Sequence, residues 1–395
     1  MKFEIWAAPE PTVARIDATS VRDQLAETGH EARDADLDLL AGLGVHATRY
    51  PVLWEKTAPA GELRLAWAAR RLERLRALGI APVVTLLHHG SGPFSTSLID
   101  PEFPERFAAY AGAVAAAFPW VRRWTPINEP LTTARFATLY GLWYPNAADD
   151  RAFGTAIVNE ALAMLLAMEA IEREAPGSQF VITEDLQAFD AHDSAVETYV
   201  AHKRERSFLS IELVMGRLVP GHALYAYLVE RCGIAPAVLA RVARHARPPD
   251  LVGWNYYPNS ERALGLDASG ATYNVPARER RAISPLPLLR RAHARLGLPF
   301  GLSEVHVNAD ERGRVAWLDA RVRALETLAA EELPIRMLGA WAAFGLVDWD
   351  SLLVRRENYV EDGIFTFAGP GATPQPTAVS AAVARYASLA VPSSS

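Results

Sequence analysis

Two glutamates occupy positions where a carboxylate could do chemistry. Glu129 stands in an Asn-Glu-Pro run at the end of the apolar segment 122–128, and the proline prevents that segment from continuing as a strand. Glu304 ends a second apolar segment, 299–304. Two carboxyl groups on separate segments can divide the work, one donating a proton while the other acts as a base or nucleophile.

Such a pair suits cleavage of a glycosidic bond, which needs an acid to protonate the leaving oxygen and a second carboxylate on the other face of the sugar. A separation of about 5–5.5 Å between the carboxyl groups would give a retaining reaction, with Glu304 attacking the anomeric carbon. A gap of about 6.5–9.5 Å would leave room for water and give inversion. The sequence leaves both outcomes open.

The remaining chain supplies elements that would hold these glutamates. Short apolar runs alternate with longer segments of helical periodicity. The predicted strands are 3–8, 45–50, 80–88, 122–128, 179–184, 250–257, 299–304 and 336–344. The predicted helices are 34–43, 67–78, 104–117, 153–174, 236–246, 286–296 and 315–330. Short helices are expected within 190–232 and a rim loop at 258–283.

This alternation allows an open doubly wound sheet or a closed barrel. The first strand–helix turn, 7–11, has no glycine-rich phosphate loop, which argues against a dinucleotide-binding sheet. Polar and aromatic residues cluster at the C-terminal ends of the strands, which a barrel gathers into one mouth. We therefore predict the α/β class, with a single (β/α)8 TIM barrel over 1–390 and a disordered tail at 391–395.

Composition narrows the functional class. The chain has 46 acidic and 40 basic residues, a net charge of −6, and no basic stripe, so nucleic acid is not an expected partner. Cys232 is the single cysteine, which excludes an intrachain disulfide and a Cys-based zinc cage. No apolar run has the length of a signal peptide or membrane span. We expect a cytoplasmic enzyme with no membrane partner; the oligomeric state stays open.

Five strand-end motifs, in this order, resemble those of the glycoside hydrolase family 1 β-glycosidases. They are Leu43-Gly44 with Arg49 and Trp54, the run 79–88 ending in His88, the run 124–130 around Glu129, the run 250–257, and the pair Trp341 and Trp349. The resemblance implies a (β/α)8 barrel that hydrolyses β-glycosides with retention, Glu129 being the acid/base and Glu304 the nucleophile.

The resemblance also implies supporting roles. Arg49 and Tyr257 would lie beside the nucleophile and orient it, and Asn255 shares the strand face of Tyr257. His88 and Asn128 would bind substrate. Trp341 would be the platform on which the sugar ring stacks.

The chain departs from the family pattern around these residues. The nucleophile motif Thr-Glu-Asn-Gly becomes Ser-Glu-Val-His at 303–306, and the glutamate before Trp349 becomes the shorter Asp348. The first-strand glutamine is not identifiable, and Glu10 stands at a strand end where it could substitute. Asp348, Trp349 and Glu10 are therefore further substrate-binding candidates in an altered sugar pocket.

Other interpretations remain open. Glu304 could be a structural ion-pair partner of Arg49, and His88 a core histidine. A metal held by His88 and His89 is disfavoured, because adjacent strand residues point to opposite faces, and no metal or cofactor is expected. The expected partner is a small-molecule glycoside or oligosaccharide, in carbohydrate metabolism. The alternatives are a non-catalytic carbohydrate-binding barrel and a glycosidase of the same clan with a divergent substrate, such as a natural-product glycoside.

Overall fold

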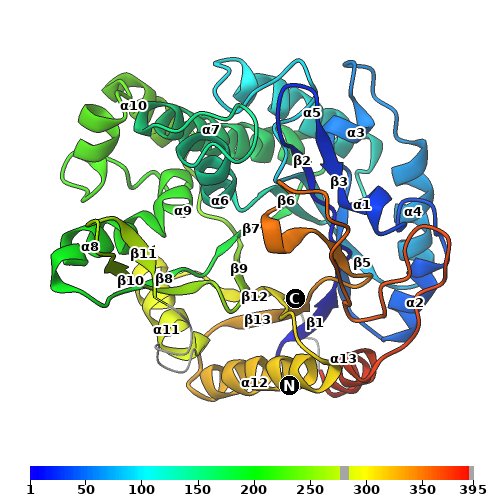
Figure 1. The fold of residues 1–395 in the computed structure, drawn as a ribbon. Coiled ribbons are helices and arrows are strands. Elements are labelled where there is room, and N and C mark those ends of the chain that lie inside the picture. Colours follow the sequence, from blue (N-terminus) through cyan, green and yellow to red (C-terminus); the bar gives the residue numbers. More distant parts are fainter. Residues whose placement is uncertain (276–283, 391–395) are drawn as a thin grey trace.

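Eight parallel strands close into a barrel in this computed structural model, which describes residues 1–275 and 284–390 (Figure 1). The barrel order is β1-β13-β12-β9-β7-β6-β5-β4. The strands are β1 (Glu4–Ala7), β4 (Ala47–Pro51), β5 (Ala81–His88), β6 (Arg123–Asn128), β7 (Gln179–Asp185), β9 (Leu251–Tyr256), β12 (Phe300–Val305) and β13 (Ile335–Ala340). Each predicted strand is present, and the (β/α)8 prediction is confirmed.

The interior of the barrel is closed at its N-terminal end. Trp6, Val83 and Val181, from three different strands, pack together in one buried cluster. Arg123 of β6 donates to Glu4 of β1 at 2.6 and 2.9 Å. Since β4 and β5 separate these two strands around the wall, this ion pair crosses the interior of the barrel.

Helices surround the barrel where the sequence predicts them. The predicted seven are α2 (Asp36–Gly42), α4 (Ala66–Ala77), α5 (Phe103–Ala117), α7 (Asp150–Glu174), α10 (Pro236–Arg244), α11 (Pro285–Leu296) and α12 (Glu311–Ala330). An unpredicted helix, α13 (Ala378–Leu389), begins at a capping box made by Thr377 and Ser380 and lies beside α12 (Figure 1).

Helix α7 alone among the described residues is long and apolar enough to cross a membrane. Of its most apolar 18-residue window, 78% is buried inside the protein, which is typical of a core helix.

Smaller elements form the rim. They are β2 (Val13–Arg15), β3 (Val21–Asp23), α1 (Gln24–Glu27), α3 (Trp54–Thr57), α6 (Pro130–Ala134), η1 (Arg135–Leu139), η2 (Ser194–Val196), α8 (Glu197–Arg206), α9 (Leu209–Val214), η3 (Tyr227–Arg231), β14 (Leu346–Val347), η5 (Trp349–Ser351) and β15 (Val360–Glu361). The short helices expected within 190–232 are thus confirmed.

The rim loop predicted at 258–283 is wrong in its described part. Strands β10 (Glu261–Leu266) and β11 (Thr272–Asn274) join β8 (Ala188–Ala191) in a three-stranded sheet. This sheet forms because Leu264 can bury itself against Phe189 and Val200, which follow a different barrel strand and are far away in sequence. The rest of that prediction, 276–283, and the predicted tail 391–395 lie outside the described residues.

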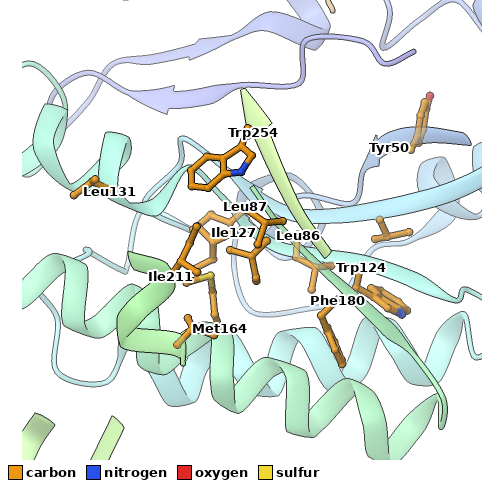
Figure 2. Packing of buried hydrophobic residues seen from close by; sticks show 14 of the residues in the cluster. Tyr50, Leu86, Leu87, Trp124, Ile127, Leu131, Met164, Phe180, Ile211 and Trp254 are labelled. Atoms are coloured by element: carbon orange, nitrogen blue, oxygen red, sulfur yellow. The ribbon is translucent and has the colours of Figure 1, made fainter. Parts of the chain in front are cut away.

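The largest core lies between the outer faces of the strands and the helices. Figure 2 shows Ile127 of β6, Phe180 of β7 and Met164 of α7 in this layer, and all three are fully buried. Ile127 is followed directly by Asn128 and Glu129, so the packing of this layer fixes the strand end that carries the first glutamate.

We predict that Ile127→Ala lowers the free energy of unfolding by about 2–5 kcal/mol, because it removes buried methyl groups and leaves a cavity. Urea denaturation followed by tryptophan fluorescence measures the change. Val238→Ala, at a position 38% exposed, is the control and should change stability by less than about 0.5 kcal/mol. Equal effects of the two substitutions would contradict the prediction.

Candidate active site

Both glutamates lie at the mouth of the barrel. Glu129 directly follows β6 and Glu304 is the penultimate residue of β12, at the C-terminal ends of these strands. A cavity of about 480 Å³ opens there, as expected for this fold. Six of the predicted site residues line it: Glu10, Glu129, Tyr257, Glu304, Trp341 and Trp349.

Glu304 is held by two donors. The Nη1 atom of Arg49 donates to one carboxylate oxygen at 2.5 Å, and the hydroxyl of Tyr257 donates to the other at 2.5 Å. Burial raises the pKa of Glu304, while the charge of Arg49 and the hydrogen bond from Tyr257 act in the opposite direction. The two contacts predicted from the sequence are present, and they favour the ionised form of Glu304.

A bulge helps to place Glu304. The pairing of β12 with β9 shifts between Leu302 and Glu304, and such bulges re-aim side chains next to active sites. The backbone oxygen of Ser303 then approaches Gly339 on β13 so closely that an added Cβ would lie 2.1 Å from it. A glycine at 339 therefore leaves room for the bulge.

Glu129 has a strained backbone and no cationic partner among the described residues. Its φ of +46° lies in the left-handed region, which few non-glycine residues adopt. One carboxylate oxygen accepts a hydrogen bond from Asn255 at 2.7 Å. Burial raises the pKa of Glu129 well above its usual range, and the negative charges of Glu304 and Asp185 raise it further. Glu129 is therefore the carboxyl group that keeps a proton.

Asn128 connects the two glutamates. Its Oδ1 atom accepts from Nη2 of Arg49 at 2.6 Å and from Thr183 at 2.7 Å, and its amide donates to His88 at 3.1 Å. Asn128 and His88 are at most 1% exposed, and neither lines the cavity. Both side chains position the groups in front of them, and their contact with substrate stays a prediction.

The wall opposite β6 and β9 contains Glu10 and Trp341. The indole of Trp341 donates to one oxygen of Glu10 at 2.9 Å, and the backbone N–H of Thr12 donates to the other at 2.9 Å. Burial, with the negative charge of Glu304 nearby, raises the pKa of Glu10 to about 7. Near neutral pH Glu10 can therefore both donate and accept hydrogen bonds, and its substitution for the missing glutamine stays a prediction.

Asp348 does not line the cavity, and its contact with substrate stays a prediction. Its carboxylate accepts from Arg22 at 2.9 Å and from the backbone N–H of Tyr359 at 2.7 Å, and it is 1% exposed. Because Asp348 is one methylene shorter than glutamate and has φ +55°, its carboxylate closes the turn before η5. Here Asp348 holds the rim together.

Asn255 acts on both glutamates. Its amide donates to Glu129 at 2.7 Å, while its Oδ1 accepts from Ser303 at 2.5 Å. Hydrogen bonding by Asn255 lowers the pKa of Glu129 and of Glu304, so it lies between them. The bulge in β12 brings Ser303 beside Asn255, and this contact fixes which way the amide points.

Several cavity residues escaped the sequence analysis. His89 lines the cavity because its φ of +58° breaks strand alternation, so the expectation that His88 and His89 point apart is wrong. Even so, the described residues include no cluster of three His, Cys, Asp or Glu side chains suited to a metal ion. The other unpredicted residues include Arg135, Asp185, Arg262, His306 and Glu361.

One of these could have been found from the sequence. Asp185 directly follows the predicted strand 179–184, as Glu129 directly follows 122–128, so its position alone was a signal. Glu361 reaches the cavity from β15, in a hairpin with β14, and lies 3.3 Å from Nε2 of His306. Its place depends on a rim hairpin that no strand pattern predicts.

Residues 5–275 match the sequence model described as Glycosyl hydrolase family 1. The chain belongs to this family. Beta-glucosidase A of Thermotoga maritima is 31% identical to it over 124 residues, which cover 29% of this chain and 28% of that protein. Beta-glucosidase 6 of Oryza sativa subsp. japonica is 29% identical over 140 residues, covering 33% and 27%. The chain thus aligns with less than a third of either relative.

Solved structures agree over a longer range. The family 1 b-glucosidase from Thermotoga maritima superposes with a TM-score of 0.80, covering 98% of each chain at 17% identity. The beta-glucosidase from the same organism in complex with glucoimidazole superposes with a TM-score of 0.81. At this identity the likeness shows the shared fold. The resemblance to family 1 read from the strand-end motifs is confirmed.

We predict that Arg49→Met lowers the free energy of unfolding by about 3–5 kcal/mol at pH 7, because it leaves a buried carboxylate without its cation. The pKa of Glu304 rises in this variant. Because of this raised pKa, Glu304 becomes neutral as the pH falls from 7 to 5. The loss in free energy of unfolding relative to wild type should therefore become smaller over this range. Urea denaturation at both pH values measures it.

The control is Arg290→Met, which removes an exposed ion pair with Glu331 on the outer helices. It should leave stability nearly unchanged at both pH values. A loss in Arg49→Met that does not depend on pH would contradict the assigned electrostatic role.

Proposed function

We propose that this family 1 chain is an O-glycosyl hydrolase that cleaves β-linked glycosides with retention of configuration. The observation that carries the proposal is the unequal environment of two buried carboxyl groups in one cavity. Glu304 is ion-paired with Arg49, whereas burial and the negative charges of Glu304 and Asp185 raise the pKa of Glu129. One group is therefore set up as a nucleophile and the other as an acid.

In the first step the ionised Glu304 attacks the anomeric carbon while Glu129 gives its proton to the glycosidic oxygen. The bond from the anomeric carbon to that oxygen breaks, an ester bond to Glu304 forms, and the leaving group departs as a neutral alcohol. Tyr257 and Arg49 each occupy one oxygen of Glu304 and restrict its orientation before the attack.

In the second step Glu129, now ionised, takes a proton from water, and the water oxygen attacks the anomeric carbon. The ester bond to Glu304 breaks, and both glutamates return to their starting states. Glu129 can act as a base here because the ester carries no charge, so the main negative neighbour that raised its pKa is gone. The second attack restores the original configuration.

The sugar is placed between the aromatic rings and Glu10. Trp341 and Trp349 line the cavity and offer apolar surface to a sugar face. The buried Nε1 of Trp349 has no partner among the described residues, so it is a free donor for a hydroxyl. Glu10, His89 and Glu361 add polar contacts. Because the relatives are named beta-glucosidases, a β-glucoside is the first substrate to test.

We predict that Glu304→Gly lowers turnover of an aryl β-glucoside by at least about 10³-fold, the scale seen when a member of a catalytic pair is lost. Azide, added to this variant, should replace the nucleophile in a single attack and give the α-glucosyl azide. Glu129→Ala should instead accumulate the glucosyl-enzyme, which azide opens to the β-glucosyl azide. Product configuration is read by proton NMR.

These two variants control for each other, since both remove a buried carboxyl group from the same cavity. Identical azide products from both would contradict the assignment of the two roles. Tight binding of the glucoside by wild type, with no hydrolysis over days, would instead favour a carbohydrate-binding barrel.

We predict a bell-shaped dependence of kcat/KM on pH. Activity should rise as Glu304 loses its proton and fall at high pH as Glu129 loses its own, since burial and neighbouring charges raise the pKa of Glu129. With a dinitrophenyl glucoside, whose leaving group needs no proton, Glu129→Gln should keep the acid limb and lose the alkaline limb. If the fall in activity at high pH persists in this variant, that fall is caused by a group other than Glu129.

A further inference from the structure

A group of cations forms the cavity wall next to Glu129. Arg135 begins η1, six residues after Glu129, and Arg262 lies on β10; both line the same cavity as the two glutamates. Neither arginine has a part in the bond-breaking steps proposed above. Their charge at this wall requires its own explanation.

Arg135 is 1% exposed and has no carboxylate in an ion pair with it among the described residues. Its guanidinium donates to the hydroxyl of Thr132 at 3.1 Å and to the backbone oxygen of Leu131 at 3.4 Å. Glu184 is a nearby acid, but burial raises its pKa to about 7, and its oxygens accept from other donors, including Ser210 at 2.8 Å. Glu184 is therefore only partly ionised near neutral pH, and it offsets part of the charge of Arg135.

Arg262 has two acidic neighbours, Asp185 and Glu129. Its Nη2 atom lies 3.6 Å from Asp185, beyond hydrogen-bond distance, while the other oxygen of Asp185 accepts from Ser260 at 2.5 Å. Burial and the charge of Arg135 lower the pKa of Arg262, and Asp185 acts against them. Because the pKa of Glu129 is raised well above its usual range, Asp185 is the carboxylate that balances one guanidinium of this wall, and the other guanidinium remains.

Two further cations stand behind the wall. Lys203 and Arg206 of α8 are 7% and 5% exposed, and no carboxylate pairs with either in the described part of the chain. Burial and the neighbouring guanidiniums lower the pKa of Lys203 to about 8. Burial alone would raise the pKa of the nearby Tyr140, yet the cations, Arg135 foremost, bring it down to about 8. The potential at this wall is therefore positive.

The position of the wall says which part of a substrate would meet it. Glu129 protonates the leaving oxygen in the proposed reaction, so the leaving group departs on its side of the cavity. Arg135 and Arg262 follow β6 and β9, the strands that carry Glu129 and Asn255. Glu10 and Trp341 lie at β1 and β13, across the barrel, on the side assigned to the sugar.

We propose that Arg135 and Arg262 form a binding site for an anionic oxygen group, a carboxylate or a phosphate, on the leaving group of the substrate. The assignment of this site to the leaving group rests on the proposed function, whereas the anion site itself rests on the charges of the cavity wall. Guanidinium forks bind such groups with two parallel hydrogen bonds, and an arginine without a carboxylate partner is available for them. The favoured substrates are β-glycosides of acidic phenols or alcohols.

The test begins with binding, which does not depend on turnover. Isothermal titration calorimetry compares 4-hydroxyphenylacetate with its methyl ester and with 4-hydroxybenzylphosphonate. Wild type should bind an acid at least about tenfold more tightly than the ester, the usual scale of a hydrogen bond to a charged group. The stronger of the two acids identifies the carboxylate or the phosphate as the better ligand.

The same comparison in variants assigns the site. Arg135→Gln and Arg262→Gln should each reduce the preference for the acid over the ester by about tenfold, and Arg262→Lys should keep part of it, because the charge remains without the fork. Arg290→Gln, on the outer helices, is the matched control and should keep the full preference. Each variant is judged by the ratio of its affinities for the acid and the ester. A loss of folded protein is therefore not mistaken for a loss of charge recognition.

Kinetics then place the site in the reaction. The 4-(carboxymethyl)phenyl β-glucoside should have a kcat/KM about tenfold above that of its methyl ester, whose phenolic leaving group is nearly matched. Hydrolysis of both at equal rates, with equal binding of acid and ester, overturns the inference and leaves the proposed function standing. Preferred binding of the acid with no hydrolysis of either glucoside supports the anion site and overturns the proposed function.

Discussion

The buried guanidinium of Arg49 is the interaction on which the rest of the site depends. One of its nitrogens holds Glu304 on β12 and another holds Asn128 on β6, so three strands of the barrel meet at one charge. Removing two ionised groups from water costs several kcal/mol each, and the close hydrogen bonds of this geometry offset part of that cost. It also lets one glutamate stay ionised while Glu129, with no cation of its own, stays protonated.

The two cavity walls on either side of these glutamates differ in charge. Glu10 stands at one wall with a pKa of about 7, while Arg135 and Arg262 make the opposite wall positive. A sugar ring presents many neutral hydroxyls, which suit the aromatic and carboxyl wall, whereas a leaving group can carry a charge. The same barrel mouth thus offers two kinds of recognition, and the cleavage chemistry lies between them.

Family membership and the local departures fit together in this arrangement. The strand-end motifs around Glu129 and Arg49 survive, and the contacts they imply are present. The motif after Glu304 has changed, and His306 from that motif now faces Glu361 of a rim hairpin. Asp348 is a second departure from the family motif that makes a contact in the rim. Its shortened side chain closes a turn with Arg22, so the outer pocket must take its polar groups from other residues.

The sequence by itself determined the eight strands, most outer helices, and the strand ends that carry Glu129 and Glu304, because strand and helix periods and Gly or Pro stops are local signals. Tertiary structure alone decided which way neighbouring side chains point. Left-handed backbone at His89 and the bulge before Glu304 broke the alternation that sequence reasoning assumes. The cationic wall also depends on the tertiary structure. Arg135 and Arg262 lie far apart along the chain and reach the same cavity only because the barrel closes.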